Sequence, residues 1–387
     1  MPKNSLQVGA NVYGSFDSLG NTGSTGEGTI GEGMVFRLNN ESLNRKTVFE
    51  YAPSYTYGTS GQKNTFSQVF NGDAYFRLGN HWSLHLKDAY RQTTDPFSAS
   101  TQLPSPEAPN ATVAIPYASQ KGDTAIAELD WQASKHAMVG FVGNFAMQRY
   151  DQVAGLVSSQ QPLLDSTNSS GRVFLRYAFS KRFSLGLEAQ YQDLFVGDSY
   201  SRTQSYSTIA YTSIQLTKHS VLTLYGGPQR SHLHNTVVLN FFFFQIPIKV
   251  VKWTTEPTGG ASYSLLMKHG RVFANYSNRI TDGGGLMGPV TLNNVSAGYE
   301  RDFTRRWSTA LGFDYGNNKA LATQNTLRSY AGTVTVKRKV TRDMNFSVSY
   351  QNLYQDQLPK QFAGFITGDR NRVFASLEYV WTHPLGR

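Results

Sequence analysis

Apolar and polar side chains alternate along most of this chain with a period of two. In the stretch 290–315, Val295, Ala297 and Tyr299 alternate with asparagine, serine and glycine, and the alternation resumes after a basic segment at 304–306. Successive side chains of a β-strand point to opposite faces, so a period of two predicts strands. The stretch is therefore predicted to be two antiparallel strands joined by a tight turn.

The polar face of these strands is too polar for the interior of a soluble protein. It carries serine, glycine and asparagine together with Glu300, Asp302 and Asp314, and buried carboxylates without partners are strongly unfavourable. A transmembrane β-barrel needs this distribution, with apolar residues facing lipid and polar residues facing water inside.

The turn is one of a repeated set, in which a basic residue usually follows serine or threonine. Its members are Ser134-Lys135, Ser180-Lys181, Thr217-Lys218, Met267-Lys268, Thr304-Arg305 and Thr341-Arg342. Lys181 and Lys218, Lys268 and Arg305, and Arg305 and Arg342 are each 37 positions apart. This spacing fits a hairpin of two strands, a short turn and a longer loop. A helical repeat of similar length is disfavoured, because the units lack apolar periodicity at three and four residues.

The same pattern predicts about eighteen strands, with sixteen as the second choice. They lie near 6–16, 30–38, 48–57, 66–78, 82–92, 123–132, 137–149, 172–179, 183–194, 205–216, 221–229, 260–266, 272–280, 290–303, 307–315, 329–337, 344–353 and 372–381. We expect an all-β protein, one closed antiparallel transmembrane barrel over 1–387, with short periplasmic turns and long extracellular loops. Closure is required because an open sheet edge would leave backbone groups unpaired in hydrocarbon.

Composition supports this interpretation. Aromatic residues make up 13% of the 387 residues and charged residues 16%, whereas soluble domains carry nearer a quarter charged residues. No apolar run is long enough for a transmembrane helix. Cysteine is absent, which excludes disulfides and fits passage through an oxidising periplasm. Residues 1–5 have no apolar core, so we expect that a secretion signal, if the protein is exported, has been removed.

The net charge of +10 does not indicate a nucleic-acid partner, because the basic residues are spread over turns and are not clustered with stacking aromatics. One interpretation is that the turn residues pair with anionic headgroups of the outer-membrane lipid at one rim. The other is that they only solvate the turns. These residues are Arg45, Lys46, Lys135, Lys181, Arg182, Lys218, Lys268, Arg305, Arg306 and Arg342.

The chain resembles bacterial outer-membrane β-barrels of the porin-like type over nearly its whole length. More narrowly, ITDGGGLMG at 280–288, FTRRW at 303–307 and PLGR at 384–387 resemble uncharacterised outer-membrane barrels of acidobacterial type. The resemblance implies a bacterial outer-membrane location and a porin-like fold, and says little about substrate. The closing segment 373–381 is similar to the final-strand signal that the barrel assembly machinery reads, although six residues follow its last aromatic.

The alternation assigns charged residues to the lumen, and the two signs roughly balance. The residues predicted to line the pore are Arg37, Arg77, Lys87, Arg91, Glu128, Asp130, Arg172, Arg176, Glu188, Glu300 and Asp314. Either they form cross-strand ion pairs that stiffen the wall, or the basic members form a ladder that favours anionic solutes.

Two long connections are candidate functional segments. Segment 93–121 is Pro-rich and lies where the constricting loop of general porins lies, so it either folds into the lumen or extends outward. Segment 230–256 is predicted to be a long apolar loop containing four phenylalanines at 241–244. That run packs within its own loop, plugs the mouth, or contacts lipid or an identical subunit.

Catalysis is not expected. Most histidines fall at turns, no Gly-rich phosphate loop opens a helix, and His232 and His234 alone are too few ligands for a metal. We therefore expect no catalytic, cofactor or metal site. The predicted function is a Gram-negative outer-membrane channel for passive diffusion of small hydrophilic solutes with a weak anion preference. The alternative is a plugged structural or export-associated barrel whose loops bind a partner or surface polysaccharide.

Overall fold

The computed structural model describes residues 4–18, 27–58, 64–94, 113, 119–151, 163–197, 201–241, 244–284, 288–322, 325–358 and 368–385. At 27, 236–241, 244–248, 250, 357–358 and 368 it describes the backbone alone. No helix in these ranges is both long and apolar enough to cross a bilayer.

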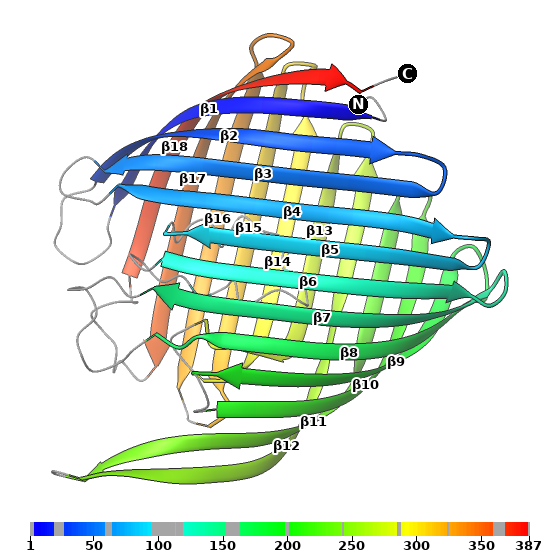
Figure 1. Cartoon of the computed structure of the whole chain (residues 1–387), viewed down its shortest axis with the longest axis vertical. Helices are drawn as coiled ribbons and strands as arrows, with labels where there is room; N and C mark the ends of the chain where they lie inside the picture. Colours follow the sequence, from blue (N-terminus) through cyan, green and yellow to red (C-terminus); the bar gives the residue numbers. More distant parts are fainter. Residues whose placement is uncertain are drawn as a thin grey trace.

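Eighteen antiparallel strands form one closed sheet, which confirms the predicted fold (Figure 1). Each strand pairs with its neighbours in chain order, and β1 pairs with both β2 and β18. The strands are β1 (Ser5–Ser18), β2 (Glu27–Glu41), β3 (Arg45–Gly58), β4 (Thr65–Leu78), β5 (Trp82–Thr93), β6 (Ser119–Gln132), β7 (Ala137–Asp151), β8 (Ser166–Ala178), β9 (Phe183–Val196), β10 (Ser201–Thr217), β11 (Ser220–Phe241), β12 (Phe244–Met267), β13 (Gly270–Thr281), β14 (Val290–Asp302), β15 (Trp307–Ala320), β16 (Thr326–Lys339), β17 (Met344–Leu358) and β18 (Gly368–Pro384).

The barrel closes between its first and last strands. Their register runs without interruption from Ser5 opposite Pro384 to Ser18 opposite Asn371. Beyond the strands, the Leu385 N–H donates to the Asn4 carbonyl at 2.9 Å. Both ends of the chain therefore lie at the end of the barrel that carries the short turns, as Figure 1 shows.

In the short turns that begin with serine or threonine, the side-chain hydroxyl fixes the backbone. The Thr304 Oγ1 accepts from the Arg306 and Trp307 N–H groups at 3.2 and 3.1 Å, and the Ser180 Oγ accepts from the Arg182 and Phe183 N–H groups at 3.2 and 3.1 Å. Such local bonds favour turns over continued strand. In the repeated Ser/Thr-Lys/Arg pair, the serine or threonine therefore stabilises the turn.

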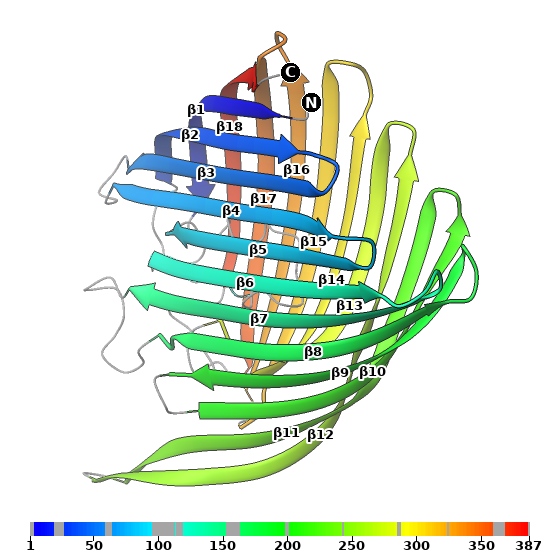
Figure 2. The ribbon, with the colours of Figure 1, turned by 45° about the vertical axis from the view of Figure 1, so that its right-hand side comes forward.

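The prediction that 230–256 forms a long loop is wrong. It is the outer part of a two-stranded hairpin, because β11 and β12 stay paired from Ser220 opposite Leu265 to Phe241 opposite Phe244. The hairpin extends past the neighbouring strand ends in both views (Figures 1 and 2). The side chains of the phenylalanine run lie outside the described residues.

The outer part of β12 is a sheet edge, since its described pairing with β13 begins only at Gly259 opposite Asn278. Edge strands are prone to pair with other chains unless charges or prolines interrupt them. Lys249, Lys252 and Pro257 lie on this stretch. They are of the residue types that discourage edge-to-edge association.

Apolar side chains cover the outside of the barrel and polar ones the inside. On β10, burial alternates residue by residue from Ser201, which is buried, to Ala210, which is exposed. Exposed aromatic residues gather near both ends of the outer wall, as membrane interfaces require. At the turn end they are Trp82, Trp131, Phe179, Phe183, Phe303, Trp307 and Trp381, and at the loop end Tyr57, Phe66, Phe195, Tyr206, Tyr330 and Tyr354.

Candidate functional site

A cavity of about 490 Å³ lies inside the barrel along the wall from β6 to β14. Its lining is rich in amides and hydroxyls, with a few aromatic and charged residues. The amide side chains are those of Asn144, Asn168, Gln190, Gln192, Gln229, Asn275, Asn278 and Asn294. Such a lining offers many hydrogen bonds and little net charge.

The amides are held in place by cross-strand bonds. The Asn144 Nδ2 donates to the Ser170 Oγ at 3.4 Å, and the Gln192 Nε2 donates to the Asn168 Oδ1 at 3.1 Å. The Oδ1 atoms of Asn144 and Asn294 are buried and have no hydrogen-bond partner among the described residues. Buried polar atoms are nearly always paired, so these two acceptors mark the cavity as a place where a donor is expected.

Aromatic rings lie flat on the wall of the cavity because glycines on adjacent strands leave room for them. A Cβ added at Gly186 would collide with the Tyr211 ring, and one added at Gly260 would collide with the ring of Tyr225. The partners face each other across strand pairs, with Tyr211 opposite Gly186 and Tyr225 opposite Gly260. Gly140 makes room for Phe174 in the same way. Glycine in a strand often permits such close approach.

The register assigns the eleven predicted pore-lining residues to the inward face, but they do not form one group. Glu128, Arg172 and Glu188 line the cavity. Other inward charges take part in ion pairs between strands, including Arg37 with Glu50 at 3.8 Å and Arg271 with Glu300 at 2.8 Å. Arg37, Arg77, Lys87, Arg91, Asp130, Arg176, Glu300 and Asp314 are absent from the described lining of the cavity.

Sequence reasoning missed the amides and the rings. It assigned lumen residues by charge, whereas Asn144, Asn294, Tyr211 and Tyr225 are uncharged. A glycine directly across the strand pair from an inward tyrosine was a usable signal, but reading it requires the register.

A mouth cluster of buried apolar residues, in two parts, lies at the loop end of the barrel. One part contains Val113, Val290, Ala320 and Leu327, with Tyr150 and Leu163 packed against it. The other contains Leu194, Val196 and Ile280, with Leu164 and Leu321 against it. The parts meet through consecutive residues at 163–164 and 320–321.

Val113 is the one residue of 95–118, within the predicted constriction segment, that the structure describes. It is 3% exposed and packs on β14, β15 and β16, which lie across the ring from β5 and β6. Gly284, at φ +62°, approaches Val113 so closely that an added Cβ would meet the valine Cβ at 2.5 Å. The rest of 95–118 lies outside the described residues.

Polar contacts tie the mouth cluster together. The Ser166 Oγ donates to the Asp282 Oδ2 at 2.7 Å, and the Asp165 Oδ1 accepts from the Tyr150 N–H at 2.9 Å. The Gln192 Nε2 also donates to the Ile280 carbonyl at 3.4 Å. The end of β13 is therefore attached to β8 and β9, which are not its sheet neighbours.

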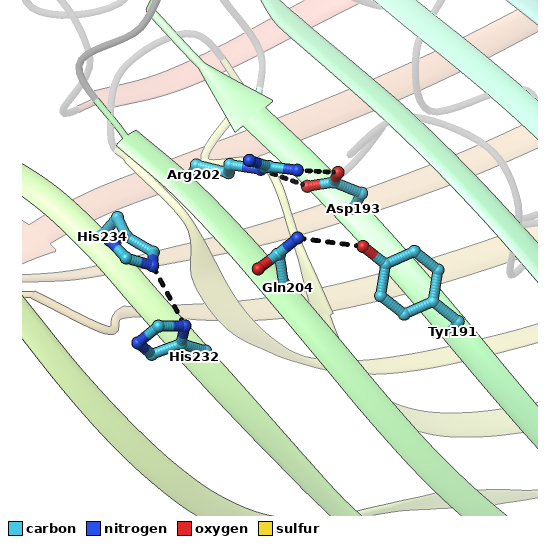
Figure 3. A network of polar contacts seen from close by, with 6 residues as sticks. All are labelled: Tyr191, Asp193, Arg202, Gln204, His232 and His234. Atoms are coloured by element: carbon cyan, nitrogen blue, oxygen red, sulfur yellow. Dashed lines mark hydrogen bonds and ion pairs between the residues drawn. The ribbon is translucent and has the colours of Figure 1, made fainter.

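A second polar group, the outward polar cluster, lies on the opposite face of β9, β10 and β11 (Figure 3). It consists of Tyr191, Asp193, Arg202, Gln204, His232 and His234. Arg202 donates twice to Asp193, at 2.9 and 2.6 Å, and the Gln204 Nε2 donates to the Tyr191 Oη at 3.0 Å.

The two histidines of this cluster pair with each other, with 3.0 Å between the His234 Nε2 and the His232 Nδ1. His232 also stacks on Trp253 at 4.2 Å between ring centroids. Among the described residues, no set of three or more metal-binding side chains is present.

Comparison with known proteins gives distant structural similarity. No protein-family model and no curated protein matches the sequence. Acinetobacter baumannii OccAB3 is similar at 10% sequence identity and a TM-score of 0.46, over 98% of this chain and 99% of that one. Pseudomonas aeruginosa OprD is similar at 11% sequence identity and a TM-score of 0.42, over 99% of this chain and 96% of that one. The ferric-catecholate import receptor Fiu of Escherichia coli is similar at 10% sequence identity and a TM-score of 0.46, over 96% of this chain and 81% of that one.

Proposed function

We propose that this protein is a channel of the bacterial outer membrane for passive diffusion of small hydrophilic solutes. The observation that carries the proposal is the inverted polarity of a closed eighteen-strand barrel, apolar outside and amide-lined within. A barrel of this size leaves room for an aqueous interior. The placement of both termini at the short-turn end supports periplasmic turns and extracellular loops.

Selectivity for charge is expected to be weak. Several inward basic residues are neutralised by carboxylates on nearby strands, as in Arg271 with Glu300 and Lys337 with Glu378. Inward basic residues outside the described cavity lining, such as Arg176, are expected to leave a small preference for anions, because charged rings bias the ions that enter a pore.

The mouth cluster supports a role for segment 93–121 as the constriction. Val113 of this segment packs at the loop end on residues of β14, β15 and β16, and this contact supports a constriction there. The same observation favours a second candidate function, a barrel permanently plugged at the mouth that serves a structural or export-associated role. Conductance distinguishes the two functions.

The test is planar-bilayer conductance of the purified protein in a salt gradient. We expect discrete single-channel steps and a reversal potential displaced slightly toward anion selectivity. Deleting 96–116 is expected to raise the single-channel conductance, because the deletion removes Val113 from the mouth cluster. Val113→Asp should act in the same direction by placing a charge among apolar residues.

Val113→Ile is the matched control, since it keeps an apolar side chain and should leave conductance near that of the unmodified protein. If deleting 96–116 does not raise the conductance, the proposal that this segment constricts the pore is wrong. If neither the unmodified protein nor the deletion variant conducts, the proposed channel function is wrong and the plugged barrel is favoured.

A further inference from the structure

We propose that the cavity between β6 and β14 is a binding site for a neutral, polyhydroxylated solute, a small saccharide, on its way through the channel. This inference rests on the proposed function and names the class of solute. It stands on three features of the cavity: its unpaired acceptors, its flat aromatic rings and its balanced charge.

The unpaired acceptors are the first feature. Asn144, on β7, is 8% exposed and Asn294, on β14, is 3% exposed, and the Oδ1 of each has no described hydrogen-bond partner. A carbonyl oxygen needs a donor, and hydroxyl groups supply donors in all directions around a sugar ring. A carboxylate or phosphate presents acceptors alone and would leave both oxygens unpaired.

The flat rings are the second feature. The hydroxyl ends of the Tyr211 and Tyr225 rings lie where a Cβ on Gly186 or Gly260 would be, so both rings extend over glycines of the neighbouring strands. Both residues line the cavity. An aromatic face next to hydrogen-bonding amides suits the two surfaces of a saccharide, the apolar C–H face and the hydroxyl rim.

The charge balance is the third feature. The described lining has two acidic residues, Glu128 and Glu188, and two basic ones, Arg172 and Arg279. Arg172, Glu188 and Arg279 already take part in interactions within the protein. No surplus of one sign therefore remains in this lining to attract a charged solute, whereas the amide acceptors are still available.

The size agrees with this class of ligand. At about 490 Å³, the cavity falls within the roughly 300–1,000 Å³ range of small-molecule sites. It also adjoins the mouth cluster, because Ile280 belongs to both.

The test uses maltose as the probe and polyethylene glycol of matched hydrodynamic size as its control. Maltose is expected to block the single-channel current in a saturable manner. Polyethylene glycol has ether acceptors and almost no donors, so it should reduce current only in proportion to its volume. Block by maltose that is no stronger than that by the polymer, in a channel that conducts, overturns the proposal.

The variants test the acceptors directly. Asn144→Leu and Asn294→Leu are each expected to weaken maltose block by up to about tenfold, the effect of losing one hydrogen bond. The matched control is Asn71→Leu on β4, because Asn71 is outside the described cavity lining and donates to Glu50 instead. It should leave the block unchanged, and equal block by all three variants would contradict the assignment.

Glucose and glucuronate separate a neutral solute from an acidic one. Stronger block by glucuronate would overturn the assignment to neutral saccharides. If the protein does not conduct, binding of maltose to the detergent-solubilised barrel is measured by calorimetry. Saturable binding that Asn294→Leu weakens would then support the site while rejecting the channel, and absence of binding would reject both.

Discussion

The two faces of β9, β10 and β11 carry polar residues of similar kinds, but these residues differ in how they are paired. Gln204 faces outward and bonds to Tyr191, while its neighbour Ser205 faces inward, 2% exposed, and bonds to Ser231 at 2.8 Å. The outward polar cluster forms self-contained pairs, as Figure 3 shows. The inward cavity keeps buried acceptors without described partners.

This difference follows from what each face meets. An outward polar group near a lipid headgroup region can exchange partners with water and headgroups. Its bonds within the protein therefore contribute little to the free energy of unfolding. An inward buried group has few alternatives, and each missing bond carries a desolvation cost. Unpaired acceptors on the inward face therefore indicate a ligand more strongly than any charge on the outward face.

The largest effect is expected at an inward glycine. Gly186→Ala places a methyl group against the Tyr211 ring and 2.6 Å from the Leu175 carbonyl oxygen. The ring must leave the wall, at a cost of about 1–3 kcal/mol in the free energy of unfolding. Urea titration of the protein folded into lipid vesicles measures this cost, and maltose block should weaken with it.

Gly171→Ala is the control on the outward face of the adjacent strand β8. An added Cβ there has no described atom within 4 Å, so the free energy of unfolding should not fall. A similar loss in both variants would show that the inward ring geometry is not the cause.

A smaller effect is expected at the pair of neighbouring residues Gln204 and Ser205. Ser205→Ala leaves the Ser231 hydroxyl buried without its partner, which costs about 1–2 kcal/mol. Gln204→Ala removes an exposed bond and should change the free energy of unfolding by less than about 0.5 kcal/mol. The double variant Ser205→Ala/Ser231→Ala should recover part of the loss, since no unpaired hydroxyl remains.

Equal destabilisation by Gln204→Ala and Ser205→Ala, in the same urea titration, would remove the distinction between the faces. A double variant that is no more stable than Ser205→Ala alone would show that the unpaired hydroxyl is not what destabilises the barrel.

The sequence was sufficient to predict the barrel because alternation is a local property. Strand number, antiparallel order and the positions of the turns all followed from apolar periodicity and from pairs such as Thr304-Arg305. The sequence pattern drew attention to the basic residue of each turn. In the turn at Thr304, however, the threonine hydroxyl makes the bonds that shape the backbone.

The site could not be predicted in the same way because it depends on register. The pairing of Tyr211 with Gly186 joins residues 25 positions apart, and only the sheet brings them together. A proline and a phenylalanine run made 230–256 resemble a loop, but extended pairing between β11 and β12 keeps it as strand. Val113 reaches β14 through a connection whose path no local pattern specifies.

The smallest effect is expected at the outward ion pair. Arg202 is 44% exposed and Asp193 15%, so a double-mutant cycle of Arg202→Ala and Asp193→Ala should give a coupling energy of about 0.5 kcal/mol that disappears in 1 M salt. The inward pair Arg370–Asp17, with 14% and 17% exposure and 3.1 Å between Nη2 and Oδ2, supplies the comparison. Its coupling should be larger and should persist in salt, because buried charges are screened less. If the outward pair couples as strongly as the inward one, the outward cluster is not governed by exchange with solvent, and its residues are then as strong an indication of a ligand as those of the cavity.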